Sequence, residues 1–206
     1  MLYYLLPVGA YLIGSISSAI VIARIMGLRD PREVGSKNPG ATNILRYGGK
    51  KAAILTLVGD TLKGVIPVLI ARALTDDATV LAATALAAFV GHLYPVFFGF
   101  QGGKGVATAL GVSLALNGWF GLALLATWIV VALVTRYSSL SALVAALSAP
   151  FYAWWLMQHS AYLTMVVAMS ALLIYRHQAN IRNLLAGKES RIGQKSTAAN
   201  ANSQSN

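Results

Sequence analysis

Long apolar stretches separated by short polar segments constrain this chain more than any other feature of its sequence. Runs such as Thr79 to Phe98 and Val112 to Val134 reach the roughly 20 apolar residues needed to cross the hydrocarbon core of a bilayer. A segment in lipid must satisfy its own backbone hydrogen bonds, so these runs are predicted to be helices. Only 11% of the residues are charged, against about 25% in a typical soluble domain. The sequence therefore predicts an all-α polytopic membrane protein.

The apolar stretches also define the domain organisation. They leave no room for a separate soluble domain, so residues 1–195 are predicted to form a single integral-membrane domain. The first stretch, about Tyr3 to Ala23, has no basic region before it and no small-residue cleavage site. It is therefore expected to be a retained span and not a signal peptide. Residues 196–206 form a low-complexity polar tail that is predicted to be disordered.

The placement of the basic residues predicts the topology. Nearly all lysines and arginines lie in segments 24–51 and 176–195 or at Lys104 and Arg136, whereas the connections between the other span ends carry none. Basic loops are typical of the cytoplasmic side. Since Lys104 and Arg136 then share one side, the chain between them must cross twice, as a short hairpin turning at Asn117-Gly118. This predicts about seven transmembrane helices, with the N-terminus outside and the C-terminus cytoplasmic. Six spans remain the alternative, because the two hairpin helices are short.

The net charge of +10 and the lack of cysteine exclude some classes of function. A strongly basic chain can bind nucleic acid, but no recognition helix or aromatic and basic platform is visible, so no nucleic-acid partner is expected. Without cysteine, disulfides, thiolate metal sites and thioester chemistry on the protein are excluded.

A glycine-rich segment, GFQGGKGVATALG, lies between two apolar runs at positions 99–111. Its glycines would let backbone amides approach an anion, and a helix starting just after them would turn its positive end toward that anion. It is not a nucleotide P-loop, which would need glycine at position 98 and Ser or Thr at position 105. The alternative is a flexible cytoplasmic turn that carries a lysine. The candidate anion-binding residues are Gly102, Gly103, Lys104 and Gly105.

The first polar loop, GSKNPGATNILRYGGKK at 35–51, carries a second group of polar side chains around Pro39-Gly40. Arg46 offers a planar fork suited to a phosphate, and Ser36 could act as a nucleophile or a hydrogen-bond donor. The alternative is an ordinary polar loop in which Thr42 or Asn43 caps a short helix. The candidate residues are Ser36, Asn38, Thr42, Asn43 and Arg46.

The third polar segment, RHQANIRNLLAGKE, spans 176–189. His177 and Asn180 are three residues apart and would share one face of a helix. Histidine can act as a general base near neutral pH, although an interface residue is the alternative for His177. Glu189 is the only acid of this basic stretch and is expected to pair with a loop arginine in a structural role.

Two ionisable residues, Asp60 and Lys63, lie inside the second span and on one helical face. Charges at that depth are costly and usually face the bundle interior or a site, so the pair is expected to brace the first loop, or alternatively to line a pocket. His92 and His159 have neither metal-ligand spacing nor acidic partners near them in the sequence, so no metal is expected. The four tryptophans are expected in interfacial or packing positions.

Three of these segments together carry a resemblance. GSKNPGATNILR, PVFFGFQGGKGVATALG and RHQANIRNLLAGKE resemble the three motifs of the acyl-phosphate-dependent glycerol-3-phosphate acyltransferase family, PlsY, in order, spacing and hydropathy. DTLKG at 60–64 and YSSL at 137–140 also resemble family positions, which adds Ser138 and Ser139 to the candidates. Lys37 and Gln101 depart from the family, which often has Gly and Lys there.

The resemblance implies a function. Such an enzyme transfers an acyl group from acyl-phosphate to the sn-1 hydroxyl of glycerol 3-phosphate, giving lysophosphatidic acid and inorganic phosphate, the first step of phospholipid synthesis. It also implies a bacterial inner (cytoplasmic) membrane location, seven spans and a site on the cytoplasmic face. Partners would be the two substrates, membrane lipid and the enzyme that supplies acyl-phosphate, and no cofactor is expected. The absence of a His-x4-Asp box disfavours enzymes that use acyl-CoA or carrier-protein thioesters.

The resemblance also implies roles for individual residues, and it leaves some of these roles undecided. The catalytic candidates would be Ser36, His177 and Asn180, while the glycine loop and Arg46 would hold the phosphate of glycerol 3-phosphate. Whether Ser36 is a nucleophile or a hydrogen-bond donor stays open, as does the choice between His177 and a substrate phosphate as base. The alternative function is a membrane transporter or binding protein for a phosphorylated metabolite. It is disfavoured because no chain of ionisable groups crosses the membrane and no inverted repeat is evident.

Overall fold

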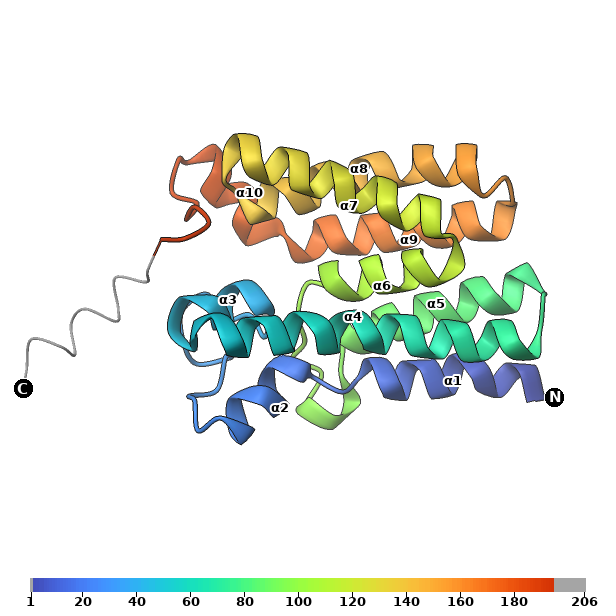
Figure 1. Cartoon of the computed structure of the whole chain (residues 1–206), viewed down its shortest axis with the longest axis horizontal. Helices are drawn as coiled ribbons and strands as arrows, with labels where there is room; N and C mark the ends of the chain where they lie inside the picture. Colours follow the sequence, from blue (N-terminus) through green and yellow to red (C-terminus); the bar gives the residue numbers. More distant parts are fainter. Residues whose placement is uncertain (1, 195–206) are drawn as a thin grey trace, which may run out of the picture.

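The computed structural model describes residues 2–194, and every regular element in that range is a helix, as predicted. In chain order these are α1 (Leu2–Gly14), α2 (Ser18–Ile25), α3 (Ala41–Tyr47), α4 (Gly49–Leu74), α5 (Ala78–Leu93), the 3-10 turn η1 (Val96–Phe98), α6 (Val106–Leu116), α7 (Gly118–Thr135), α8 (Ser138–Leu156), α9 (Ser160–Arg176) and α10 (Gln178–Leu185). The long helices lie side by side along one axis, with α7, α8 and α9 on one side, α1, α4 and α5 on the other, and α6 between them (Figure 1). The tail predicted to be disordered, residues 196–206, lies outside the described residues.

Helix length and hydropathy support several membrane crossings within residues 2–194. Four segments are long and apolar enough to span a bilayer, namely α4, Ala78–Phe98, α7 and α8, and the bent pair of α1 and α2 makes a fifth if it counts as one span. α6 and α9 are apolar but shorter, with 11 and 17 residues. The seven-span count and the orientation of the termini therefore stay predictions.

The first span is broken. The sequence predicts one stretch from Tyr3 to Ala23, but the structure divides it between α1 and α2, which meet at 40°. The break frees the backbone carbonyl of Ile16, which accepts a hydrogen bond of 2.8 Å from the Lys63 Nζ atom. A freed carbonyl at membrane depth needs such a partner, so the lysine of α4 stabilises the bend.

The predicted hairpin turn at Asn117-Gly118 is confirmed. α6 ends at Leu116, α7 begins at Gly118, and the side-chain oxygen of Asn117 accepts a hydrogen bond of 3.1 Å from the backbone N–H of Phe120. An asparagine at this position caps the new helix by satisfying one of its free amides. The cap thus reverses the chain at this point.

α4 and α6 pack with their backbones in close approach. A methyl group on Gly64 would collide with the carbonyl oxygen of Thr108, and one on Gly111 would collide with that of Thr61. Small residues allow such contacts between membrane helices. The Thr108 hydroxyl also donates a 2.9 Å hydrogen bond to the backbone oxygen of Asp60. These contacts fix the start of α6 beside the part of α4 that carries Asp60.

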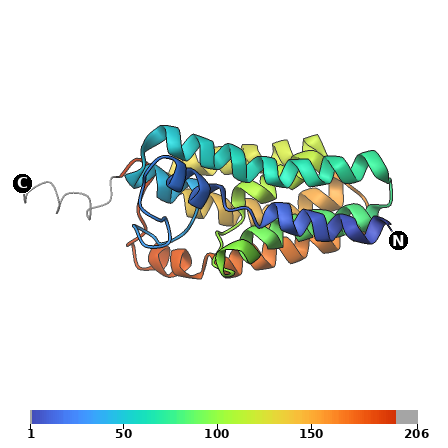
Figure 2. The same ribbon diagram turned by 90° about the horizontal axis from the view of Figure 1, so that it is seen from below.

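The polar segments gather toward one end of the bundle. The first loop with α3 and the connection to α10 lie at the end opposite the start of α1, and the glycine-rich segment lies further in, beside the start of α6 (Figures 1 and 2). The main apolar core lies between α5, α6, α8 and α9 and includes Phe89, Leu93 and Met165. The structure thus brings the three polar segments close together, while the side of the membrane on which they lie stays a prediction.

Candidate active site

The glycine-rich loop is held in place by α9. The Arg176 guanidinium donates hydrogen bonds of 2.7 Å to the carbonyl oxygen of Gly102 and 3.1 Å to that of Gly103. It also stacks at 5.6 Å from the ring of Tyr94. Gly105 has a φ of 86°, a left-handed conformation that favours glycine, and α6 begins directly after it without a side-chain cap. The first amides of α6 are therefore free to face an anion.

Lys104 belongs to a hydrogen-bonded chain that joins three polar segments. Its Nζ atom donates to the Asn180 side-chain oxygen at 2.5 Å, and the Asn180 amide donates to Glu189 at 2.7 Å. The Ser139 hydroxyl donates to the same Glu189 oxygen at 2.6 Å. A carboxylate only accepts, so Glu189 orients the amide of Asn180 and turns its oxygen toward the lysine.

Burial lowers the pKa of Lys104 to about 8, and the positive charges of Arg46 and Arg176 act in the same direction, while Glu189 opposes them. At neutral pH the ammonium is still mostly protonated. Its charge is only partly compensated in a poorly hydrated setting, which favours an added anion.

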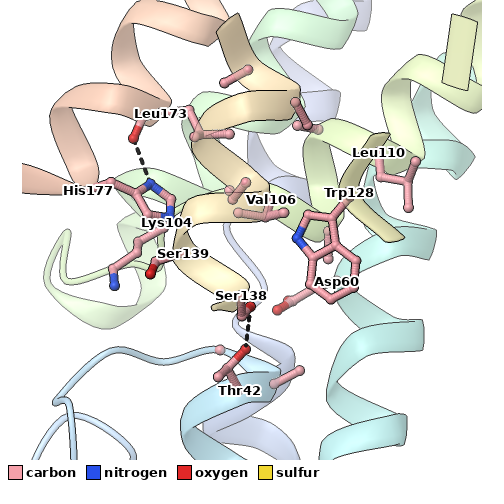
Figure 3. Close-up of a pocket in the computed structure, with 18 of the residues that line it drawn as sticks. Thr42, Asp60, Lys104, Val106, Leu110, Trp128, Ser138, Ser139, Leu173 and His177 are labelled. Atoms are coloured by element: carbon pink, nitrogen blue, oxygen red, sulfur yellow. Dashed lines mark hydrogen bonds between the residues drawn. The ribbon is translucent and has the colours of Figure 1, made fainter. Parts of the chain in front are cut away.

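His177, between α9 and α10, is 2% exposed. Its Nδ1 atom lies 2.8 Å from the carbonyl oxygen of Leu173 (Figure 3). A carbonyl can only accept, so Nδ1 carries the proton and Nε2 is left with a free lone pair. Burial lowers the pKa of His177 to about 4, and the charges of Lys104 and Arg176 add to this. The imidazole is therefore neutral at pH 7 and able to accept a proton at Nε2, as a weaker base than an ordinary histidine.

The first loop is shaped by Asn43, which is 1% exposed. Its amide donates hydrogen bonds of 3.0 Å to the carbonyl oxygens of Pro31 and Val34, and its side-chain oxygen accepts from the backbone N–H of Ser36 at 3.0 Å. The alternative in which Thr42 or Asn43 caps a short helix is wrong, because Gly40 occupies the cap position of α3 without a side-chain bond. Asn43 therefore fixes the position of the Ser36 backbone through this hydrogen bond.

A cavity of about 320 Å³ joins these segments. Its polar half lies among the first loop, Lys104 and α10. Thr42 and Ser138 line this half with their hydroxyl oxygens 3.4 Å apart (Figure 3). Its apolar half runs between α6, α7, α8 and α9, where small residues such as Ala109, Ala146 and Ala149 leave room. The shape suits a molecule with an anionic head and an apolar chain.

Most of the sequence-predicted site residues line this one cavity. They are Ser36, Asn38, Thr42, Asn43, Arg46, Asp60, Lys104, Gly105, Ser138, Ser139, His177, Asn180 and Glu189. Gly102, Gly103 and Lys63 are not among its lining residues. The two glycines pack against His92, and Lys63 turns toward the break between α1 and α2.

Two expectations about charged partners are wrong. Glu189 was expected to pair with a loop arginine, but it accepts hydrogen bonds from Ser139 and Asn180 instead. His92 was expected to have no acidic partner, yet its Nδ1 atom lies 3.7 Å from the Asp60 carboxylate, which in turn lies 2.9 Å from the Lys63 ammonium. Asp60 and His92 lie on different helices, so spacing along the sequence carries no signal of their contact.

Two further residues were missed by the sequence analysis. Arg176 holds the glycine loop, although it reads in the sequence only as one more basic residue near a span end. Trp128, expected at an interface or in packing, lines the same cavity as His177 and Asp60 (Figure 3). A tryptophan in the middle of an apolar run gives no sign of which face it occupies.

Known proteins are similar to this chain in sequence and in fold. The sequence profile of the family described as glycerol-3-phosphate acyltransferase matches residues 4–187. The chain belongs to this family. It is 60% identical over 195 residues to the glycerol-3-phosphate acyltransferase of Herminiimonas arsenicoxydans, covering 93% of this chain and 95% of the relative. It is 58% identical over 201 residues to that of Thiobacillus denitrificans, covering 95% and 100%.

Two solved structures of a glycerol-3-phosphate acyltransferase have the same fold. The crystal structure of PlsY (YgiH), an integral membrane glycerol 3-phosphate acyltransferase, in its glycerol 3-phosphate form matches with a TM-score of 0.89 and 45% identity, covering 94% of this chain and 96% of that chain. Its lysophosphatidic acid form matches with a TM-score of 0.87 and 44% identity, covering the same shares.

Proposed function

We propose that the protein transfers an acyl group from acyl-phosphate to the sn-1 hydroxyl of glycerol 3-phosphate, giving lysophosphatidic acid and inorganic phosphate. The observation that carries this proposal is the cavity, which joins a cationic, hydrogen-bonding half to an apolar half between helices. Family membership supports the acceptor, and the related structures bear glycerol 3-phosphate and lysophosphatidic acid.

The phosphate of glycerol 3-phosphate is assigned to the polar half. Lys104 and Arg46 both line the cavity and supply positive charge there, and the uncapped start of α6 adds free amides. Asn180 holds one of the three lysine protons and leaves the others for the phosphate. Ser36, Asn38, Ser138 and Ser139 surround this region as hydrogen-bonding groups.

In the transfer step, the sn-1 hydroxyl oxygen attacks the acyl carbonyl carbon. Its proton passes to Nε2 of His177 or to a substrate phosphate oxygen, and the bond between the acyl carbon and the donor phosphate breaks, releasing inorganic phosphate. The donor is a mixed anhydride and already reactive, so positioning and charge neutralisation supply most of the catalysis. Ser36 is assigned a hydrogen bond to the donor, because direct transfer needs no acyl-enzyme.

The basic loops gather with the polar half of the cavity, so the site is assigned to the cytoplasmic side of the bacterial inner membrane. The apolar half then lies at membrane depth, where the surroundings are apolar and suit an acyl chain. The enzyme that makes acyl-phosphate would deliver it from the same side.

The test uses the purified chain in mild detergent. Glycerol 3-phosphate is offered with either palmitoyl-phosphate or palmitoyl-CoA, and phosphate and lysophosphatidic acid are measured together. We expect equal amounts of both products from acyl-phosphate and none from CoA. If lysophosphatidic acid formed only with palmitoyl-CoA, acyl-phosphate would be rejected as the donor. No product from either, with uptake of labelled glycerol 3-phosphate into proteoliposomes, would favour the transporter.

A further inference from the structure

His92 is a buried group that lines the cavity but has no role in the proposed transfer reaction. It lies in the last turn of α5 and is 6% exposed. Its backbone oxygen accepts a hydrogen bond of 3.2 Å from the backbone N–H of Gly103. The glycine loop therefore rests directly on the end of α5.

The side chain of His92 explains why the loop needs glycine at position 103. A methyl group on Gly103 would collide with the Nε2 atom of the imidazole, and one on Gly102 would collide with the backbone oxygen of His92. Both glycines are also buried. Their smallness thus serves contact with α5, since neither lines the cavity.

The imidazole of His92 also contacts charged groups of α4. Its Nδ1 atom lies 3.7 Å from the Asp60 carboxylate, which lies 2.9 Å from the Lys63 ammonium. Lys63 in turn donates a hydrogen bond to the carbonyl oxygen of Ile16 at the break of the first span. The same Asp60 oxygen, Oδ1, faces both the Lys63 ammonium and the His92 imidazole. The ring of His92 is therefore enclosed between Asp60 on one side and Gly103 on the other.

We infer that His92 is a positioning residue: through contact with Gly103 it sets the place of Lys104, and so the affinity for the phosphate of glycerol 3-phosphate. The inference rests on the proposed function, because it takes Lys104 as a ligand of that phosphate. Arg176 binds the carbonyl oxygens of Gly102 and Gly103. Because these atoms are fixed, the position of the loop depends further on its contact with His92. The apolar half of the cavity is built from other helices and does not depend on this contact.

The first variant is His92→Ala, which keeps the backbone oxygen and removes only the ring. We expect the KM for glycerol 3-phosphate to rise about tenfold, the usual effect of losing one well-formed contact. The KM for palmitoyl-phosphate and the kcat should change little. His159→Ala is the matched control, since His159 is exposed in the connection between α8 and α9. A fall in kcat with both KM values unchanged would overturn the inference.

The second variant is Gly103→Ala, alone and combined with His92→Ala. We expect Gly103→Ala to raise the KM for glycerol 3-phosphate strongly, and the double variant to recover part of that loss because the added methyl group then occupies the space left by the ring. A purely structural role for His92 predicts additive losses. A double variant no better than Gly103→Ala would overturn the inference.

Two outcomes separate this inference from the proposed function. If the unaltered protein makes no lysophosphatidic acid, the proposed function fails. If it is active and the double variant shows no recovery, only the role of His92 fails. Should His92→Ala not fold in detergent, Gly103→Ala alone decides, since an unchanged KM for glycerol 3-phosphate would overturn the inference.

Discussion

The two halves of the cavity are built in different ways. In the polar half, hydrogen bonds of 2.5 to 2.7 Å join Lys104 of the glycine-rich segment, Asn180 and Glu189 of the third polar segment, and Ser139 of α8. In the apolar half, the walls are alanine, leucine and valine side chains together with Phe120, Trp128 and Met169, and these would contact a ligand by packing. Directed bonds recognise one charge in one place, whereas packing selects only by length and width. Changes in the polar half should therefore alter turnover by orders of magnitude, and changes in the apolar half should alter the preference among chains.

The largest effect is expected for Lys104→Met, which keeps the length of the side chain and removes its charge. We expect kcat/KM for glycerol 3-phosphate to fall about a thousand-fold, because a preorganised cation near the phosphate is lost. Lys51→Met is the matched control, since Lys51 is an exposed lysine in the first turn of α4. Steady-state kinetics of phosphate release give the comparison. A loss of only about tenfold would show that backbone amides and Arg46 carry the phosphate instead.

A somewhat smaller effect is expected for His177→Gln. If Nε2 accepts the proton, kcat should fall about a hundred-fold, the usual contribution of a general base. Since the pKa of His177 is about 4, its neutral form is complete at neutral pH and is lost only as the pH falls through about 4. A fall in rate near pH 6 would instead belong to the phosphate of the substrate. Near-normal turnover of the variant at pH 7 would transfer the base role to that phosphate.

Sequence patterns predict what depends on neighbours along the chain. The all-helical fold follows from the apolar runs, the turn at Asn117-Gly118 follows from local chemistry, and the gathering of three polar segments follows from where the spans end. These features need no knowledge of how one helix is rotated against another. The polar half of the cavity was therefore foreseeable as a group of residues.

The pairings inside that group were not foreseeable. The contact of His92 with Asp60 depends on the rotation and depth of α5 against α4. The hydrogen bond that the Asn180 amide donates to Glu189 depends on how the chain folds back after α10. The bend after α1 depends on Lys63 reaching Ile16 from another helix. In each case the partner is set by packing between helices, which no local pattern encodes.

The next effect concerns pH and tests whether Lys104 binds phosphate through its charge. Its pKa, lowered by burial to about 8, leaves the charged form populated below that pH and removes it as the pH rises through about 8. We therefore expect the KM for glycerol 3-phosphate to rise about tenfold between roughly pH 7 and pH 9. Lys104→Arg stays protonated throughout and should lack this rise, whatever its turnover. The same rise in that variant would assign the titration to another group.

The smallest effect belongs to the apolar half and tests whether packing alone selects the chain. Ala146 of α8 lines this part of the cavity, so Ala146→Leu should shorten or narrow it. We expect the KM for palmitoyl-phosphate to rise about fourfold relative to that for decanoyl-phosphate, since each methylene kept out of the cavity forfeits about 0.8 kcal/mol. Leu147→Phe enlarges an exposed residue of the same helix and serves as the control. An equal rise for both donors would show that position 146 does not select by chain length, and no rise for either would show that neither chain reaches Ala146. The KM for glycerol 3-phosphate should stay unchanged because the polar half is untouched.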